Sequence, residues 1–139
     1  VLDLLEWLKT GAEPSVVYLS DLHGLDGEET MAVVYHLFRQ GERFEVLVKA
    51  VTPRSSPRVP SVTSLWEGAS WPEREVMELF GIRIADHPDP RNLLLPDGWE
   101  GYPLRKDYRY PAEHPYLAPD PLHEDPASTE QEASPERDA

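Results

Sequence analysis

The sequence of 139 residues contains no cysteine, and it has only 13 Lys and Arg against 26 Asp and Glu. The lack of thiols excludes disulfides, thiolate zinc sites, iron–sulfur ligation and a cysteine nucleophile for these residues. The resulting net charge of −13 repels phosphate backbones, so we expect no nucleic-acid partner. Apolar runs stay well short of the roughly 18 residues that a membrane helix needs, so we also expect no direct membrane insertion. Phosphate-binding and nucleophile-elbow motifs are missing as well.

Proline is abundant instead, at 15 residues, and it gathers with acidic residues toward the end of the chain. Residues 112–139 carry eight acids and one base, so −7 of the net charge lies there. Apart from proline, the only apolar side chains after Leu122 are three alanines, and such a stretch cannot bury enough surface to offset its ordering entropy. We therefore expect a folded domain over residues 1–111, an extended docking arm over 112–122 and a disordered acidic tail over 123–139.

The first 111 residues alternate between helical and strand-like patterns, which predicts an α+β fold. Leucines recur at helical spacing over residues 2–8, and β-branched and aromatic runs over residues 16–22, 31–39 and 43–52 predict strands. Gly41 lies between the last two runs and favours a hairpin. A second helix is predicted from Pro72 to Phe80, with Gly81 as its left-handed cap.

Three carboxylates, Glu73, Glu75 and Glu78, share this second helix, and paired carboxylates are able to act as general acid and base. We favour a structural interpretation. Glu73 and Glu75 lie in the first turn, where the helix dipole favours negative charge, and Arg74 with Glu78 has the i,i+4 spacing of a surface ion pair. The five histidines show neither i,i+4 nor His-x-His spacing, so we expect no metal site, and His87 lies in a sequence typical of a turn.

One stretch of the chain carries several distinctive motifs in order. From Trp71 it reads Trp-Pro-Glu-Arg-Glu-Val-Met-Glu-Leu-Phe-Gly-Ile. His87-Pro88-Asp89 and Leu94-Leu95-Pro96-Asp97 follow, and then Trp99-Glu100-Gly101-Tyr102-Pro103-Leu104-Arg105-Lys106-Asp107-Tyr108. This order resembles the family of the 30 kDa (C-type) subunit of respiratory complex I, the NADH:quinone oxidoreductase, and of related membrane-bound nickel–iron hydrogenase complexes. The residues that match the family motifs are Glu73, Arg74, Glu75, Phe80, Gly81, His87 and Pro88.

The match is dense over residues 59–108 and departs from the family pattern at three positions. Glu78 stands where the family usually has Asp, Asp86 where Gly is common and Tyr102 where His is frequent. The resemblance implies a small two-layer domain with a mixed β-sheet packed against helices.

The resemblance also implies a function. The chain would be a non-catalytic scaffold subunit without cofactors of its own, in the peripheral arm of a proton-pumping complex on the cytoplasmic side of the membrane. Its partners would be a large quinone-site or hydrogenase-like subunit and iron–sulfur subunits, which would hold the clusters and the flavin or nickel–iron centre. The alternatives are the equivalent subunit of a membrane-bound hydrogenase or a free-standing acidic interaction module.

Bases and tyrosines are concentrated near the end of the predicted domain, in an otherwise acidic chain. Arg and Tyr are enriched at interface anchors, so we expect this segment to bind the partner, although an incidental surface turn is the simpler alternative. We expect Arg105→Glu to leave the domain folded and to weaken assembly. The residues predicted to dock are Pro103, Leu104, Arg105, Lys106, Asp107, Tyr108, Arg109 and Tyr116.

Overall fold

The computed structural model describes residues 1–13, 15, 18–39, 41 and 43–110. The chain divides into two units, Val1–Tyr108 and Arg109–Ala139. The predicted arm and tail, including Tyr116, lie outside the described residues. The elements of the first unit are α1 (Leu2–Thr10), β1 (Tyr18–Asp26), β2 (Thr30–Phe38), β3 (Glu45–Pro53), β4 (Arg58–Pro60), the 3-10 helix η1 (Glu67–Ala69), α2 (Ser70–Phe80) and β5 (Arg83–Ala85).

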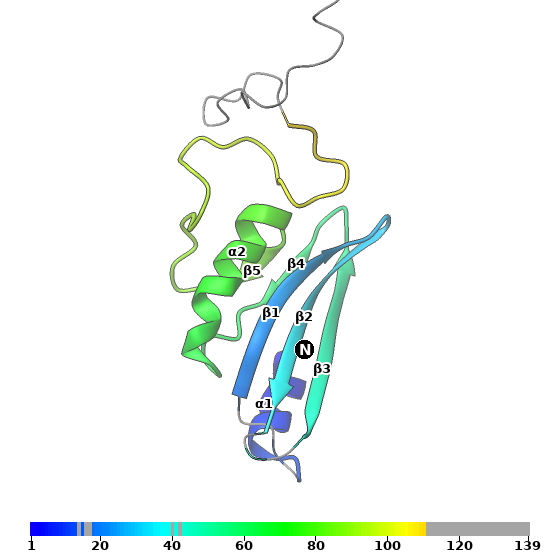
Figure 1. Cartoon of the computed structure of the whole chain (residues 1–139), viewed down its shortest axis with the longest axis vertical. Helices are drawn as coiled ribbons and strands as arrows, with labels where there is room; N and C mark the ends of the chain where they lie inside the picture. Colours follow the sequence, from blue (N-terminus) through cyan, green and yellow to red (C-terminus); the bar gives the residue numbers. More distant parts are fainter. Residues whose placement is uncertain (14, 16–17, 40, 42, 111–139) are drawn as a thin grey trace, which may run out of the picture. The chain divides into compact units, whose positions relative to one another are not determined.

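Strands β1, β2 and β3 form an antiparallel sheet in that order (Figure 1). The predicted hairpin is confirmed: Phe38 at the end of β2 pairs with Glu45 at the start of β3, and Gly41 between them has a φ of 87°. Strand β1 extends four residues beyond the predicted end, because its backbone continues to pair with β2 as far as Asp26 opposite Met31.

The α+β class is confirmed, but the strands form two sheets instead of a single mixed sheet. Strand β4 pairs in parallel with β5, with Val59 opposite Ile84. Pro53 is the last residue of β3 and Pro57 immediately precedes β4, and both lack the backbone N–H that a continuous ladder needs. The parallel pair is therefore short and separate from the antiparallel sheet.

The hydrophobic core lies on one face of the antiparallel sheet. Side chains alternate along the strands, so Leu22, Tyr35 and Val48 share this inner face, and each is at most 9% exposed. Leu5 of α1 and Val76 of α2 belong to the same buried cluster. Both helices therefore contribute to one core, against the same face of the sheet.

Helix α2 lies beside β1 (Figure 1) and begins at Ser70, two residues earlier than predicted, because η1 leads directly into it. Its predicted end is confirmed, with Gly81 in the left-handed region at φ 67°. Near that end, the ring of half-buried Phe80 covers Gly24 of β1, and a Cβ on Gly24 would lie 2.5 Å from Phe80 Cδ2. Gly24 therefore allows helix and strand to approach closely.

Among the described residues, no helix has both the length and the apolar character needed to cross a membrane.

Candidate docking site

Glu73 connects helix α2 to the loop that follows β4. Its carboxylate accepts hydrogen bonds from the backbone N–H of Val62 at 2.6 Å and from the hydroxyl of Ser61 at 2.7 Å, and the residue has no exposed surface. Burial raises the pKa of Glu73, while the hydrogen bonds from Val62 and Ser61 oppose that rise. The carboxylate is thus used to hold a loop, which is a structural role.

His87 lies beside Glu73 and is 8% exposed. Its Nδ1 accepts the backbone N–H of Asp89 at 3.0 Å, so the ring proton resides on Nε2, which donates to the carbonyl of Ser70 at 3.0 Å. Nε2 also lies 3.7 Å from Glu73 Oε2. The ring therefore fastens the turn after β5 to the start of α2.

Arg74 and Glu78 hold the chain segment that follows this turn. Arg74 donates to the carbonyls of Arg91 and Asn92, both at 2.7 Å. Glu78 accepts backbone N–H groups from residues 93–95 at 2.9, 2.8 and 3.2 Å. The ion pair predicted between Arg74 and Glu78 is thus replaced by contacts of both side chains with consecutive peptide groups of one loop.

Two further motif residues, Glu75 and Pro88, are exposed on the surface. Close by, Asp89 forms a two-pronged ion pair with Arg91 at 2.7 Å, and the hydrogen bonds from Arg91 hold the pKa of Asp89 below its usual range.

The predicted docking segment folds back onto the domain. Arg105 donates through Nε to the carbonyl of Phe80 at 2.7 Å and through Nη2 to that of Gly81 at 3.4 Å, and its guanidinium lies 4.4 Å from the ring centre of Tyr102. The backbone N–H of Leu104 donates to the carbonyl of Leu79 at 3.0 Å. These contacts satisfy carbonyls at the negative end of α2. Arg105→Glu would remove these contacts of the side chain, and the expectation that this variant leaves the domain folded stays a prediction.

A second set of contacts fixes the segment to the far end of the sheet. The guanidinium of Arg54 pairs with Asp26 and, at 2.7 Å, with Asp107, whose pKa it lowers by hydrogen bonding. The backbone N–H of Lys106 donates to Asp26 Oδ2 at 2.8 Å, and the hydroxyl of Tyr108 donates to the carbonyl of Glu100 at 3.2 Å. Residues 104–108 thus form a fixed part of the surface.

Several side chains of this fixed segment remain accessible. Leu104 is 48% exposed, the side chain of Asp107 is 69% exposed, and Lys106 is exposed as well. Arg109 and Tyr110 are exposed in the second unit. The backbone and Arg105 therefore hold the segment in place, and its remaining side chains are presented to solvent.

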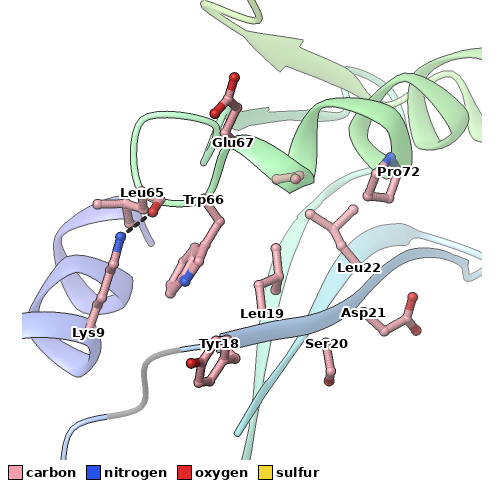
Figure 2. A pocket seen from close by; sticks show the side chains of 12 residues that line it. Lys9, Tyr18, Leu19, Ser20, Asp21, Leu22, Leu65, Trp66, Glu67 and Pro72 are labelled. Carbon is pink, nitrogen blue, oxygen red and sulfur yellow. Dashed lines mark hydrogen bonds between the residues drawn. The ribbon is translucent and has the colours of Figure 1, made fainter. Parts of the chain in front are cut away.

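A groove of about 520 Å³ opens between α1, the start of β1 and η1 (Figure 2). Leu19 and Leu22 point into it from β1, and Trp66 borders it beside Lys9. The ammonium of Lys9 lies 5.3 Å from the ring centre of Trp66 and donates to the carbonyl of Leu65. Sequence reasoning did not anticipate this groove, because its residues come from distant parts of the chain and form no local pattern.

Comparisons with known proteins match most of the chain. A family model described as "Respiratory-chain NADH dehydrogenase, 30 Kd subunit" covers residues 1–114. Over 105 residues, 74% of this chain and 20% of the relative, the chain is 47% identical to the C/D-type subunit of the NADH-quinone oxidoreductase of Phocaeicola vulgatus. Over 116 residues, 81% of this chain and 67% of the relative, it is 38% identical to the C-type subunit of the NADH-quinone oxidoreductase of Roseiflexus castenholzii.

A solved structure of the membrane-bound sulfane sulfur reductase, described as an archaeal respiratory membrane complex, contains a chain of similar fold. The TM-score is 0.60 at 24% sequence identity, over 78% of this chain and 65% of that chain. In length, the matched part of this chain spans about a fifth of the C/D-type relative and two thirds of the C-type relative.

Proposed function

The chain belongs to the family of the 30 kDa (C-type) subunit of the respiratory-chain NADH dehydrogenase, and on that basis we propose that it is a non-catalytic scaffold subunit of a NADH-quinone oxidoreductase. In this role it binds the large quinone-site subunit in the peripheral arm, on the cytoplasmic side of the membrane, and positions that subunit for electron transfer. The names of the related proteins favour a quinone reductase over a hydrogenase complex, because they specify NADH-quinone oxidoreductase.

The observation that carries this proposal is the C/D-type relative from Phocaeicola vulgatus. Its name joins the letters of two subunits, and this chain matches only 20% of its length. A protein of that length has room for the C-type domain together with a much larger D-type partner in one polypeptide. Two domains joined covalently in one organism are natural binding partners where they are separate chains, and the D-type subunit is therefore the partner that we propose.

The chemistry of the chain supports a scaffold role. The 139 residues contain no cysteine to ligate iron–sulfur clusters. The two buried motif carboxylates, Glu73 and Glu78, are occupied by backbone N–H groups, and in Glu73 also by a hydroxyl. We therefore assign the iron–sulfur clusters and the flavin to partner subunits.

The docking segment supplies the proposed contact. Its backbone is held by the end of α2 and by Asp26, so presenting Leu104 and Lys106 to a partner costs little additional conformational entropy. Lys106 adds a positive charge to an acidic chain and pairs with a partner carboxylate. Pro103, Tyr108 and Arg109 flank these two residues, and Tyr116 extends the proposed contact along the chain.

The test is co-purification of the chain with the D-type subunit encoded in the same genome. Lys106→Glu reverses a charge at an exposed side chain and leaves the backbone hydrogen bond to Asp26 in place. We expect this variant to fold as the wild type does and to recover less D-type subunit, with the deficit growing at low salt, because charge repulsion is then less screened.

Lys49→Glu is the matched control, because Lys49 is an exposed lysine on β3, outside the docking segment. Recovery with this variant should equal that of the wild type. Equal recovery of D-type subunit with all three chains overturns the proposal that this segment binds the partner. Failure of the wild-type chain to bind any D-type subunit overturns the scaffold function.

A further inference from the structure

Three side chains able to ligate a metal gather on the outer face of the antiparallel sheet, opposite the core. They are Asp21 and His23 of β1 and His36 of β2, and their ligand atoms all lie within 4.8 Å of one another. Asp21 pairs directly with His36 across the two strands, and His23 follows two residues later on the same face. None of the three takes part in the docking segment.

An irregularity in β1 creates this arrangement. Leu19 pairs with Leu37 and Asp21 pairs with His36, so Ser20 is an extra residue in the ladder. Because side chains alternate between faces, this extra residue turns Asp21 outward, whereas Leu19 and Leu22 point into the groove (Figure 2). The hydroxyl of Ser20 donates to the carbonyl of His36 at 3.1 Å and ties the two strands together at this point.

The side chains already lie close to a ligating geometry. His23 Nδ1 is 3.0 Å from Asp21 Oδ2, and the ring centres of His23 and His36 are 5.1 Å apart. Ligand atoms around a tetrahedral zinc ion stand about 3.3 Å apart, given zinc–ligand bonds of about 2.0 Å. Small side-chain rotations therefore bring all three ligand atoms to that separation. His23 and Asp21 are free to rotate in this way, because 42% and 58% of their side-chain surface is exposed.

We propose that Asp21, His23 and His36 bind a transition-metal ion of the Zn²⁺ type. Two imidazole nitrogens and one carboxylate oxygen favour Zn²⁺ over Mg²⁺ or Ca²⁺, which prefer oxygen ligands alone. Three protein ligands leave one tetrahedral position for water or for a side chain of another molecule. The site is independent of the proposed scaffold function, because it lies on different residues and its test requires no partner.

The experiment is a zinc titration of the purified full chain, free of any histidine tag, by calorimetry, together with visible spectroscopy of the Co²⁺ form. We expect one ion per chain and the absorption bands of tetrahedral Co²⁺. His36→Gln and His23→Gln should each weaken the affinity at least about tenfold, because loss of a direct ligand costs no less than loss of its supporting hydrogen bond. Zinc should raise the unfolding temperature of the wild type and not that of these variants.

The matched control, called the tail variant, replaces His114 of the predicted arm and His123 of the predicted tail by glutamine, and it should bind zinc as the wild type does. If Asp21, His23 and His36 only form hydrogen bonds among themselves, the two cluster variants bind zinc as well as the wild type. That result overturns the proposal, as does the absence of one-to-one binding or an affinity that falls only in the tail variant.

Discussion

Glu73 is an acidic side chain without exposed surface, so its protonation is coupled to folding. Burial raises the pKa of Glu73 in the folded protein above the ordinary value of 4.5. Between pH 4.5 and the folded pKa, the folded state therefore holds a proton that the unfolded chain has already released. The stability linked to this proton is complete below pH 4.5 and is lost as the pH rises toward the folded pKa. The hydrogen bonds from Val62 and Ser61 favour the ionised form and oppose this rise in the pKa of Glu73.

This linkage predicts a pH-dependent difference between the wild type and Glu73→Gln. The stability of the wild type relative to that of the variant should fall as the pH rises from about 4.5, by at most about 1.4 kcal/mol per pH unit for one proton. Urea unfolding of both proteins at several pH values between 4.5 and 7 measures this difference in stability. Glu75→Gln, an exposed change on the same helix, is the control and should show no such trend; a flat profile for Glu73→Gln contradicts the linkage.

Glu78 accepts three backbone N–H groups from one loop, so a substitution of Glu78 should destabilise mainly that loop. In Glu78→Gln an NH₂ group replaces one acceptor oxygen and faces those donors, at a cost of about 1–3 kcal/mol. We expect faster hydrogen exchange at the amides of residues 93–95, while strand β2 keeps its protection. Unchanged exchange in this loop would show that the carboxylate does not hold it.

At the scale of elements, the contact between α2 and β1 depends on Gly24 and Phe80. Gly24→Ala would place a methyl group within 2.9 Å of three ring atoms of Phe80, and overpacking of this kind costs about 1–3 kcal/mol. In a Phe80→Ala background the ring is gone and most of that cost should disappear. A double-mutant cycle by chemical denaturation measures the coupling, and additive costs would mean that the ring lies elsewhere.

Local signals predicted the elements better than their arrangement. Gly81 after an amphipathic run indicated the end of α2, and Gly41 indicated a hairpin, because each requirement concerns neighbouring residues. The extra residue at Ser20 and the division into two sheets depend on pairing between distant strands, which a single sequence does not encode locally.

The same limit on prediction from local sequence applies to the candidate docking site. The sequence analysis singled out Arg74, Glu78 and Arg105, but the groups that these side chains contact were not predictable from spacing. Arg105 contacts residues 24 and 25 positions away, and Glu78 binds a loop at least 15 positions away. An i,i+4 pair is visible in sequence, whereas a side chain that binds backbone groups of a remote loop leaves no pattern.

At the scale of the whole molecule, every member of the buried core cluster among the residues that the structure describes lies between Leu5 and Ile84. A chain that ends at Tyr110 should therefore keep its unfolding temperature within about 3 °C, which corresponds to well under 1 kcal/mol in a domain of this size, although it loses more than half of the net charge. Thermal unfolding followed by circular dichroism measures this.

A second truncation gives the contrast. A chain that ends at Tyr102 loses the contact of Asp107 with Arg54 and the hydrogen bond from Arg105 to the carbonyl of Phe80, and a charged hydrogen bond such as the latter contributes about 1.5–3 kcal/mol. Its unfolding temperature should fall clearly below that of the longer truncation. Equal temperatures would contradict the structural role assigned to the docking segment.

The attachment of residues 104–107 also sets an order of events during synthesis on the ribosome. The β1–β2–β3 meander pairs neighbours in sequence, so it is able to form as soon as β3 has emerged. The carbonyls of Phe80 and Gly81 accept their hydrogen bonds from Arg105 only after residue 105 has been synthesised. Asp26 likewise accepts the backbone N–H of Lys106 only after 80 more residues have been added. Until then the carbonyls of Phe80 and Gly81 lack their Arg105 partner, and the proposed docking segment forms only when the rest of the domain is complete.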